Sequence, residues 1–214
     1  MAVFPLVIGL RSASVLVSFV GLPVVFFLLV PLVRHVDWKI LLRIVVGLLV
    51  GTPIGVWVLV RIEERWLTIG LGAFLVLYLL TDMLAANRGR RELPRFAGYI
   101  AGFLGGAIGG AFNTSGPPVA AYISSLPLDK HAAKATILAY LALGSLYKVG
   151  FLAWQGMITR EILVTGAVLL APTILGMLAG RFVFNRVSST AFRWAIQGLL
   201  VATAMLMLVN GIRG

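Results

Sequence analysis

The sequence GGAFNTSGPP, residues 109–118, places three adjacent polar side chains directly before a glycine and two prolines. A proline cannot continue a helix from the preceding side, because it lacks an N–H and its ring clashes with the turn before it. Proline is favoured in the first turn of a helix, where a preceding Ser or Gly suits the N-cap position. The stretch therefore predicts a discontinuous helix, in which one half-helix ends and another begins.

A helix break of this kind offers hydrogen-bond donors to a ligand, and the N-terminus of a helix favours a negative charge. Pro117 and Pro118 have no N–H, so the donors would be the backbone of residues 113–116 and Val119, together with the polar side chains. A small oxyanion suits such a set. The alternative is a kinked, tightly packed helix without a ligand, since Gly and Pro are frequent in membrane helices. The clustering of three polar side chains favours the binding site.

Lys148 lies near the middle of the stretch between Lys134 and Arg160. A charge inside a membrane span is costly and usually faces an interior cavity, where it would be a counter-charge for an anion. The alternative is that the helix ends near residue 153 and the lysine snorkels to the headgroups. Tyr140 and Tyr147, if they lie on the same helix, supply hydroxyl donors. The candidate substrate-binding residues are Asn113, Thr114, Ser115, Gly116, Pro117 and Lys148.

The elements that must position these residues are membrane-spanning helices. The 214 residues are 60% hydrophobic and only 12% charged, whereas a soluble domain carries about 25% charged residues. Apolar runs of roughly 20 residues recur along the chain, the length that crosses a bilayer. We predict an all-α, multi-pass bundle in a cell membrane, the bacterial plasma membrane. The predicted spans are 12–33, 38–60, 65–84, 96–126 (broken), 132–154, 161–182 and 191–211.

The net charge of +11 lies in short loops, which indicates contact with the anionic headgroups of the lipid bilayer. Nucleic-acid binding would need clustered basic residues with stacking aromatics, so we expect no nucleic-acid partner. The chain has no cysteine and therefore no Cys-based metal site, and we expect no metal and no cofactor. No Asp or Glu lies in the middle of a predicted span, so a coupling ion would lack a carboxylate ligand there, although backbone carbonyls at a helix break could still hold Na⁺.

The two halves of the chain resemble each other. The segment LLVGTPIGVWVLV (48–60) aligns with LLAPTILGMLAGR (169–181), which pairs Thr52 with Thr173 and Gly55 with Gly176. We predict a first four-helix transmembrane repeat over 1–84, a polar connecting loop over 85–95 and a second repeat over 96–214; internal duplication is common in secondary transporters. Four spans in each half would make the repeats parallel, whereas a re-entrant segment would invert them.

The segment GFLGGAIGGAFNTSGPPVAAY and the following HAAKATILAYLALGSLYKVG resemble the second repeat of the TauE/SafE family of sulfite and organosulfonate exporters. VFPLVIGLRSASVLVSFVGL and HVDWKILL resemble parts of its first repeat. The resemblance implies an exporter of a small anion. In that family the first repeat also begins with a Gly-rich half-helix, so we expect such a segment ahead of Met1, as the counterpart of residues 96–112.

Two other functions are open at this level. A membrane-embedded enzyme would use Ser115 as a nucleophile and Lys148 as its base, and it predicts a hydrogen bond between them. A non-transporting assembly subunit predicts neither that bond nor a cavity. A transporter predicts a cavity at residues 113–116, and we expect it to work without a coupling ion, because an anion leaving an inside-negative cell gains about 2.3 kcal/mol per charge and 100 mV.

Overall fold

The computed structural model describes residues 10–85 and 93–184. These residues form seven α-helices and one 3-10 helix without any strand, which confirms the all-α prediction for the described part of the chain. The elements are α2 (Leu10–Leu29), η1 (Val30–His35), α3 (Trp38–Arg61), α4 (Glu64–Ala85), α5 (Ala97–Phe112), α6 (Gly116–Ser124), α7 (Lys130–Trp154) and α8 (Arg160–Phe184).

Within the described residues, four segments are long and apolar enough to cross a bilayer, and they match four of the predicted spans: Ser12–His35, Trp38–Arg61, Lys130–Trp154 and Arg160–Gly180. The predicted span 65–84 forms helix α4, and the predicted broken span forms the helices α5 and α6. The predicted span 191–211 and the segment before Leu10 lie outside the described residues.

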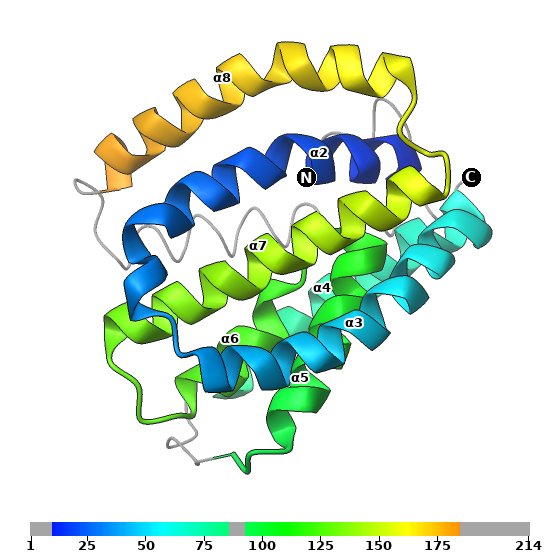
Figure 1. Ribbon diagram of the computed structural model, residues 1–214. Coiled ribbons are helices and arrows are strands. Elements are labelled where there is room, and N and C mark those ends of the chain that lie inside the picture. The colour runs from blue at the N-terminus through cyan, green and yellow to red at the C-terminus, as the bar shows by residue number, and fades with distance from the viewer. Residues whose placement is uncertain (1–9, 86–92, 185–214) are drawn as a thin grey trace.

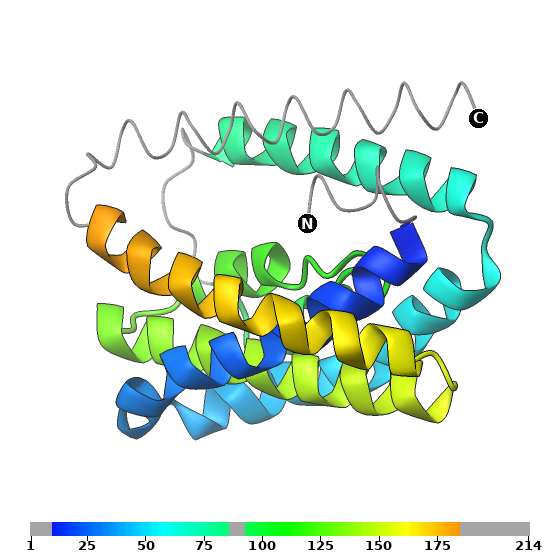
Figure 2. The same ribbon diagram turned by 90° about the horizontal axis from the view of Figure 1, so that it is seen from above.

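The helices pack side by side, in a spatial order that differs from their order along the chain. In Figure 1, α8, α2 and α7 follow one another across the molecule, and α3 and α5 lie beyond α7. Figure 2 shows the same bundle from above, with α4 along one side of it. The short helix α6 packs against both α5 and α7. As a result α7 lies between α2 on one side and the α3–α5 pair on the other.

Glycines set the tightest contact in the bundle, between α3 and α5. A Cβ atom added at Gly51 would overlap the carbonyl oxygen of Phe103, and one added at Gly102 would overlap that of Ile44. At Gly110 it would lie 2.7 Å from the carbonyl oxygen of Thr52. Small residues at helical spacing allow close backbone approach between helices. The glycines of α5 pack in this way against α3.

The helices α3 and α7 begin at the same end of the bundle. The side chain of Asp37 caps α3 and that of Asp129 caps α7, each by accepting two backbone hydrogen bonds. The backbone N–H of Asp37 donates to the hydroxyl of Thr136 on α7 at 3.1 Å, which ties the two helix starts together. The pKa of the Asp129 carboxyl is lowered, mainly because its charged form accepts a hydrogen bond from the backbone N–H of Ala132.

The outer surface is strongly apolar. Trp154 is 77% exposed, Val168 is 68% exposed and Leu175 is 67% exposed, so large hydrophobic side chains point away from the bundle. Such a surface would be unfavourable in water but matches the hydrocarbon chains of a bilayer. Together with the four apolar segments long enough to cross a bilayer, this surface identifies the chain as an integral membrane protein.

Candidate functional site

Helices α5 and α6 are separated by residues 113–115. Asn113 adopts the left-handed conformation, with φ 57° and ψ 25°, and its N–H donates to the carbonyl oxygen of Gly109 at 2.9 Å. It is the only residue besides glycine with a positive φ in the described part of the chain. Asparagine tolerates this conformation better than most residues, so it suits the position that ends α5.

Lys148 lies in the last third of α7 and is buried, with 4% of its surface exposed. Its ammonium group donates hydrogen bonds to three oxygens: Ser14 Oγ at 3.2 Å, the carbonyl of Gly109 at 3.0 Å and Asn113 Oδ1 at 2.6 Å. All three are uncharged, and they match the three N–H bonds of an ammonium group. The lysine therefore faces the interior and does not snorkel to the headgroups.

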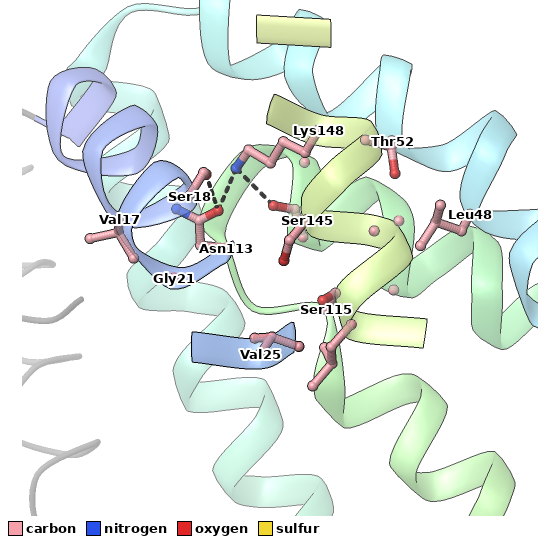
Figure 3. Close-up of a pocket in the computed structure, with 16 residues that line it drawn as sticks. Val17, Ser18, Gly21, Val25, Leu48, Thr52, Asn113, Ser115, Ser145 and Lys148 are labelled. Carbon is pink, nitrogen blue, oxygen red and sulfur yellow. Dashed lines mark hydrogen bonds between the residues drawn. The ribbon is translucent and has the colours of Figure 1, made fainter. Parts of the chain in front are cut away.

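The side chain of Asn113 joins the break to helix α2. Its Nδ2 donates to the carbonyl oxygen of Ser14 at 2.8 Å, and its Oδ1 accepts from the hydroxyl of Ser18 at 2.8 Å. The hydroxyl of Ser18 also lies 2.7 Å from the carbonyl oxygen of Ser14. Figure 3 shows the side chains of Ser18, Asn113 and Lys148 pointing toward one another from α2, the break and α7.

A cavity of about 240 Å³ lies beside this hydrogen-bond network. It is lined by α2, α3, α5, α7 and the break, so residues far apart in the sequence meet there. Several of its walls are bare backbone, because Gly21, Gly105, Gly109 and Gly144 carry no side chain. The polar side chains that line it are Ser18, Thr52, Asn113, Ser115, Ser145 and Lys148.

The structure brings three of the six sequence-predicted site residues to this cavity: Asn113, Ser115 and Lys148. The other three, Thr114, Gly116 and Pro117, are not among its lining residues. The hydroxyl of Thr114 donates instead to the carbonyl oxygen of Phe112 at 3.1 Å. Gly116 and Pro117 lie in the first turn of α6.

Sequence reasoning missed the contribution of α2. Ser14 and Ser18 are both buried, with 0% and 6% of their surfaces exposed, and both contact Asn113. They are four residues apart, which places them on the same face of a helix. Their hydroxyls, at helical spacing within a largely apolar span, were the signal that could have identified them.

The two tyrosines proposed as donors to a ligand have other partners. The hydroxyl of Tyr140 lies 3.3 Å from the carbonyl oxygen of Gly102, and that of Tyr147 lies 3.4 Å from the carbonyl oxygen of Leu49. Neither tyrosine lines the cavity. Both hydroxyls thus contact backbone carbonyls of α3 and α5.

Comparison with known proteins agrees with the interpretation of the chain as a membrane protein. The chain is 24% identical over 173 residues to the probable inner membrane transporter protein TsaS of Comamonas testosteroni. The aligned residues make up 80% of this chain and 72% of that relative. It is 26% identical over 152 residues to the probable sulfite/organosulfonate exporter TauE of Cupriavidus necator, which covers 69% of this chain and 59% of that relative. No solved structure matches the chain. The family profile described as "Sulfite exporter TauE/SafE" matches residues 1–207, so the chain belongs to the TauE/SafE family of membrane transporters.

Proposed function

We propose that this protein exports a small sulfur oxyanion, sulfite or an organosulfonate, across the inner membrane. The family and the name of the relative TauE support this substrate class, and the name of the relative TsaS supports the inner membrane. The observation that carries the proposal is the position of Lys148, a buried cation at the cavity. In the described residues, all hydrogen-bond partners of its ammonium group are uncharged. A positive charge without a carboxylate partner in a low-dielectric interior is stabilised by a bound anion.

We place the substrate site at the α5–α6 break. Of the six residues predicted from the sequence, Asn113, Ser115 and Lys148 line the cavity, and we propose that these three form the substrate site, whereas the hydroxyl of Thr114 is bound to the carbonyl oxygen of Phe112. Ser18, Thr52 and Ser145 add hydroxyl groups on its other walls. Hydroxyl and ammonium groups are the donors that an oxyanion requires, and the apolar remainder of the wall strengthens these electrostatic contacts.

The pair α5 and α6 would act as one discontinuous transmembrane segment within a protein of two similar repeats. The 16 residues of α5 and the 9 residues of α6 are each too short to cross a bilayer, whereas the pair is long enough. The helices α3 and α8 each contain a proline next to a threonine, Pro53 with Thr52 and Pro172 with Thr173. Discontinuous helices at the contact between repeats form the substrate sites of many secondary transporters.

An enzymatic function has weaker support. Within the described residues, Lys148 donates its hydrogen bonds to Ser14, Gly109 and Asn113, and Ser115 is not among these partners. Ser14 does contact the lysine, but it is fully buried and does not line the cavity, so a substrate could not reach its hydroxyl. The family is also one of exporters.

A flux assay tests the proposal. The purified protein is reconstituted into liposomes loaded with sulfite in oxygen-free buffer, and efflux is followed with and without a potential set by K⁺ and valinomycin. We expect efflux to rise when the sulfite side is negative, without any Na⁺ or proton gradient. Flux that stops when only the proton gradient is collapsed would refute uncoupled export. Lack of flux for sulfite and for every sulfonate tested would refute the substrate class.

A further inference from the structure

The side-chain oxygen of Asn113 has the surroundings of an anion oxygen. It accepts a short hydrogen bond of 2.6 Å from the ammonium of Lys148 and a second one of 2.8 Å from the hydroxyl of Ser18. The orientation of the amide follows from its partners, because a lysine can only donate and the carbonyl oxygen of Ser14 can only accept. One oxygen that accepts from an ammonium and a hydroxyl is the arrangement that binds a carboxylate or a sulfonate.

All three N–H bonds of Lys148 are used within the protein, so an anion cannot reach this ammonium without replacing one of its partners. Two of these partners are part of the helical scaffold: Ser14 lies on α2, and Gly109 contributes its backbone carbonyl from α5. The third partner is the Asn113 side chain at the break, which also lines the cavity. Asn113 is therefore the partner that an anion entering from the cavity can displace.

The displacement is local. Ser18 has a single hydroxyl proton and two acceptors within reach, Asn113 Oδ1 at 2.8 Å and the carbonyl oxygen of Ser14 at 2.7 Å. When Asn113 leaves, the Ser18 hydroxyl still has an acceptor until it turns toward the anion. Lys148 meanwhile keeps its bonds to Ser14 and Gly109. Lys148 thus exchanges a neutral acceptor, the amide oxygen of Asn113, for a charged oxygen of the anion. Hydrogen bonds between charged groups are stronger than those to a neutral acceptor.

We propose that Asn113 Oδ1 is an internal substitute for an oxygen of the transported oxyanion, and that binding of the anion to Lys148 and Ser18 displaces it. This inference rests on the proposed function. The hydrogen bond between Lys148 and the side chain of Asn113 joins α7 to the break, and displacement of Asn113 breaks this bond. Asn113 is thus a positioning residue that couples the arrival of the substrate to movement of the α5–α6 break relative to α2 and α7.

Two substitutions at Asn113 separate this role from that of an ordinary ligand. Asn113→Gly keeps the left-handed backbone, which glycine adopts freely, and removes the competing oxygen. The Kd for sulfite should fall about fivefold or more, because a net hydrogen bond to a charged group no longer has to be broken, whereas the transport rate per bound substrate should fall. Asn113→Asp places a carboxylate of the same shape on the same two donors, so the Kd should rise about tenfold or more.

Sulfite binding is measured by calorimetry on the purified full-length protein, and flux by the liposome assay, after size-exclusion chromatography and thermal unfolding show that each variant is folded. Thr114→Val is the matched control beside the site, since its hydroxyl contacts only the carbonyl of Phe112 among the described residues, and its Kd should equal that of the unchanged protein. Ser18→Ala removes a donor that the anion needs and should raise the Kd even if Asn113→Gly fails to fold.

The outcomes distinguish this inference from the proposed function. If the unchanged protein binds sulfite but Asn113→Gly binds it equally or more weakly, Asn113 is an ordinary ligand or a structural residue and the inference is overturned. The same conclusion follows if Asn113→Asp binds sulfite as tightly as the unchanged protein does. If the unchanged protein binds neither sulfite nor a sulfonate, the proposed function fails, and the inference fails with it.

Discussion

The ammonium of Lys148 donates a hydrogen bond of 3.0 Å to the carbonyl oxygen of Gly109, the same oxygen that accepts from the backbone N–H of Asn113. Gly109 lies in the last turn of α5, where the backbone carbonyls carry the partial negative charge of the helix end. A lysine from a neighbouring helix thus satisfies the C-terminus of α5 inside the bundle. This contact explains how a positive charge is held within the membrane without a carboxylate.

Replacing this charge tests its role in transport. Lys148→Met keeps the unbranched apolar part of the side chain and removes the ammonium, so sulfite flux should fall roughly 10- to 100-fold, the loss expected for hydrogen bonds to a charged group. The measurement is the initial rate of efflux from liposomes that contain equal amounts of folded protein. Lys134→Met is the control, because Lys134 is an exposed lysine on the same helix. Equal loss in both variants would mean that the effect is not specific to the site.

Filling the cavity tests whether the substrate passes through it. A Cβ atom at Gly21 would meet nothing within 4 Å, so Gly21→Leu should fold normally while its side chain occupies part of the cavity. We expect sulfite flux to fall about tenfold or more, because a binding site must exclude the added volume. At Gly176 an added Cβ also meets no atom within 4 Å, but this residue does not line the cavity, so Gly176→Leu should leave the flux unchanged. Normal flux in Gly21→Leu would place the pathway elsewhere.

The two neighbouring hydroxyl residues of the break should differ in their importance. Ser115 lines the cavity, whereas the hydroxyl of Thr114 contacts the carbonyl of Phe112. We expect Ser115→Ala to raise the KM for sulfite roughly three- to tenfold, about the value of one hydrogen bond, and Thr114→Val to leave it within about twofold. Flux measured over a range of sulfite concentrations gives both KM values. A larger rise in KM for Thr114→Val than for Ser115→Ala would show that Thr114, and not Ser115, faces the substrate.

The close contact of α3 and α5 should be sensitive to a single methyl group. In Gly102→Ala the new Cβ would overlap the carbonyl oxygen of Ile44, so the two backbones must separate, at a cost of roughly 1–3 kcal/mol. In Gly176→Ala the Cβ meets nothing, and helix stability should rise by about 0.5–1 kcal/mol, because alanine is favoured over glycine in helices. Thermal unfolding in detergent should therefore show a lower Tm for the first variant and an unchanged or higher Tm for the second.

The sequence alone was sufficient to predict a bundle of membrane helices and the places where one helix ends and the next begins around residues 113–115. Apolar runs of about 20 residues can only be helices in a bilayer, because every backbone polar group must be satisfied within the segment. The end of α5 and the start of α6 follow from the properties of Asn113, Pro117 and Pro118, which act within one or two turns.

Only the tertiary structure decided which residues meet at the site. The partner of the α5 glycines, the contacts of Ser14 and Ser18, and the interior position of Lys148 all join helices that are far apart in the sequence. Hydrophobic periodicity shows that a helix is buried, but it does not say against which neighbour. Whether Lys148 snorkels or turns inward depends on the oxygens that other helices present to it. The hydrogen-bond partners of Asn113 on α2 and α7 are therefore a property of the packed bundle and not of any one segment.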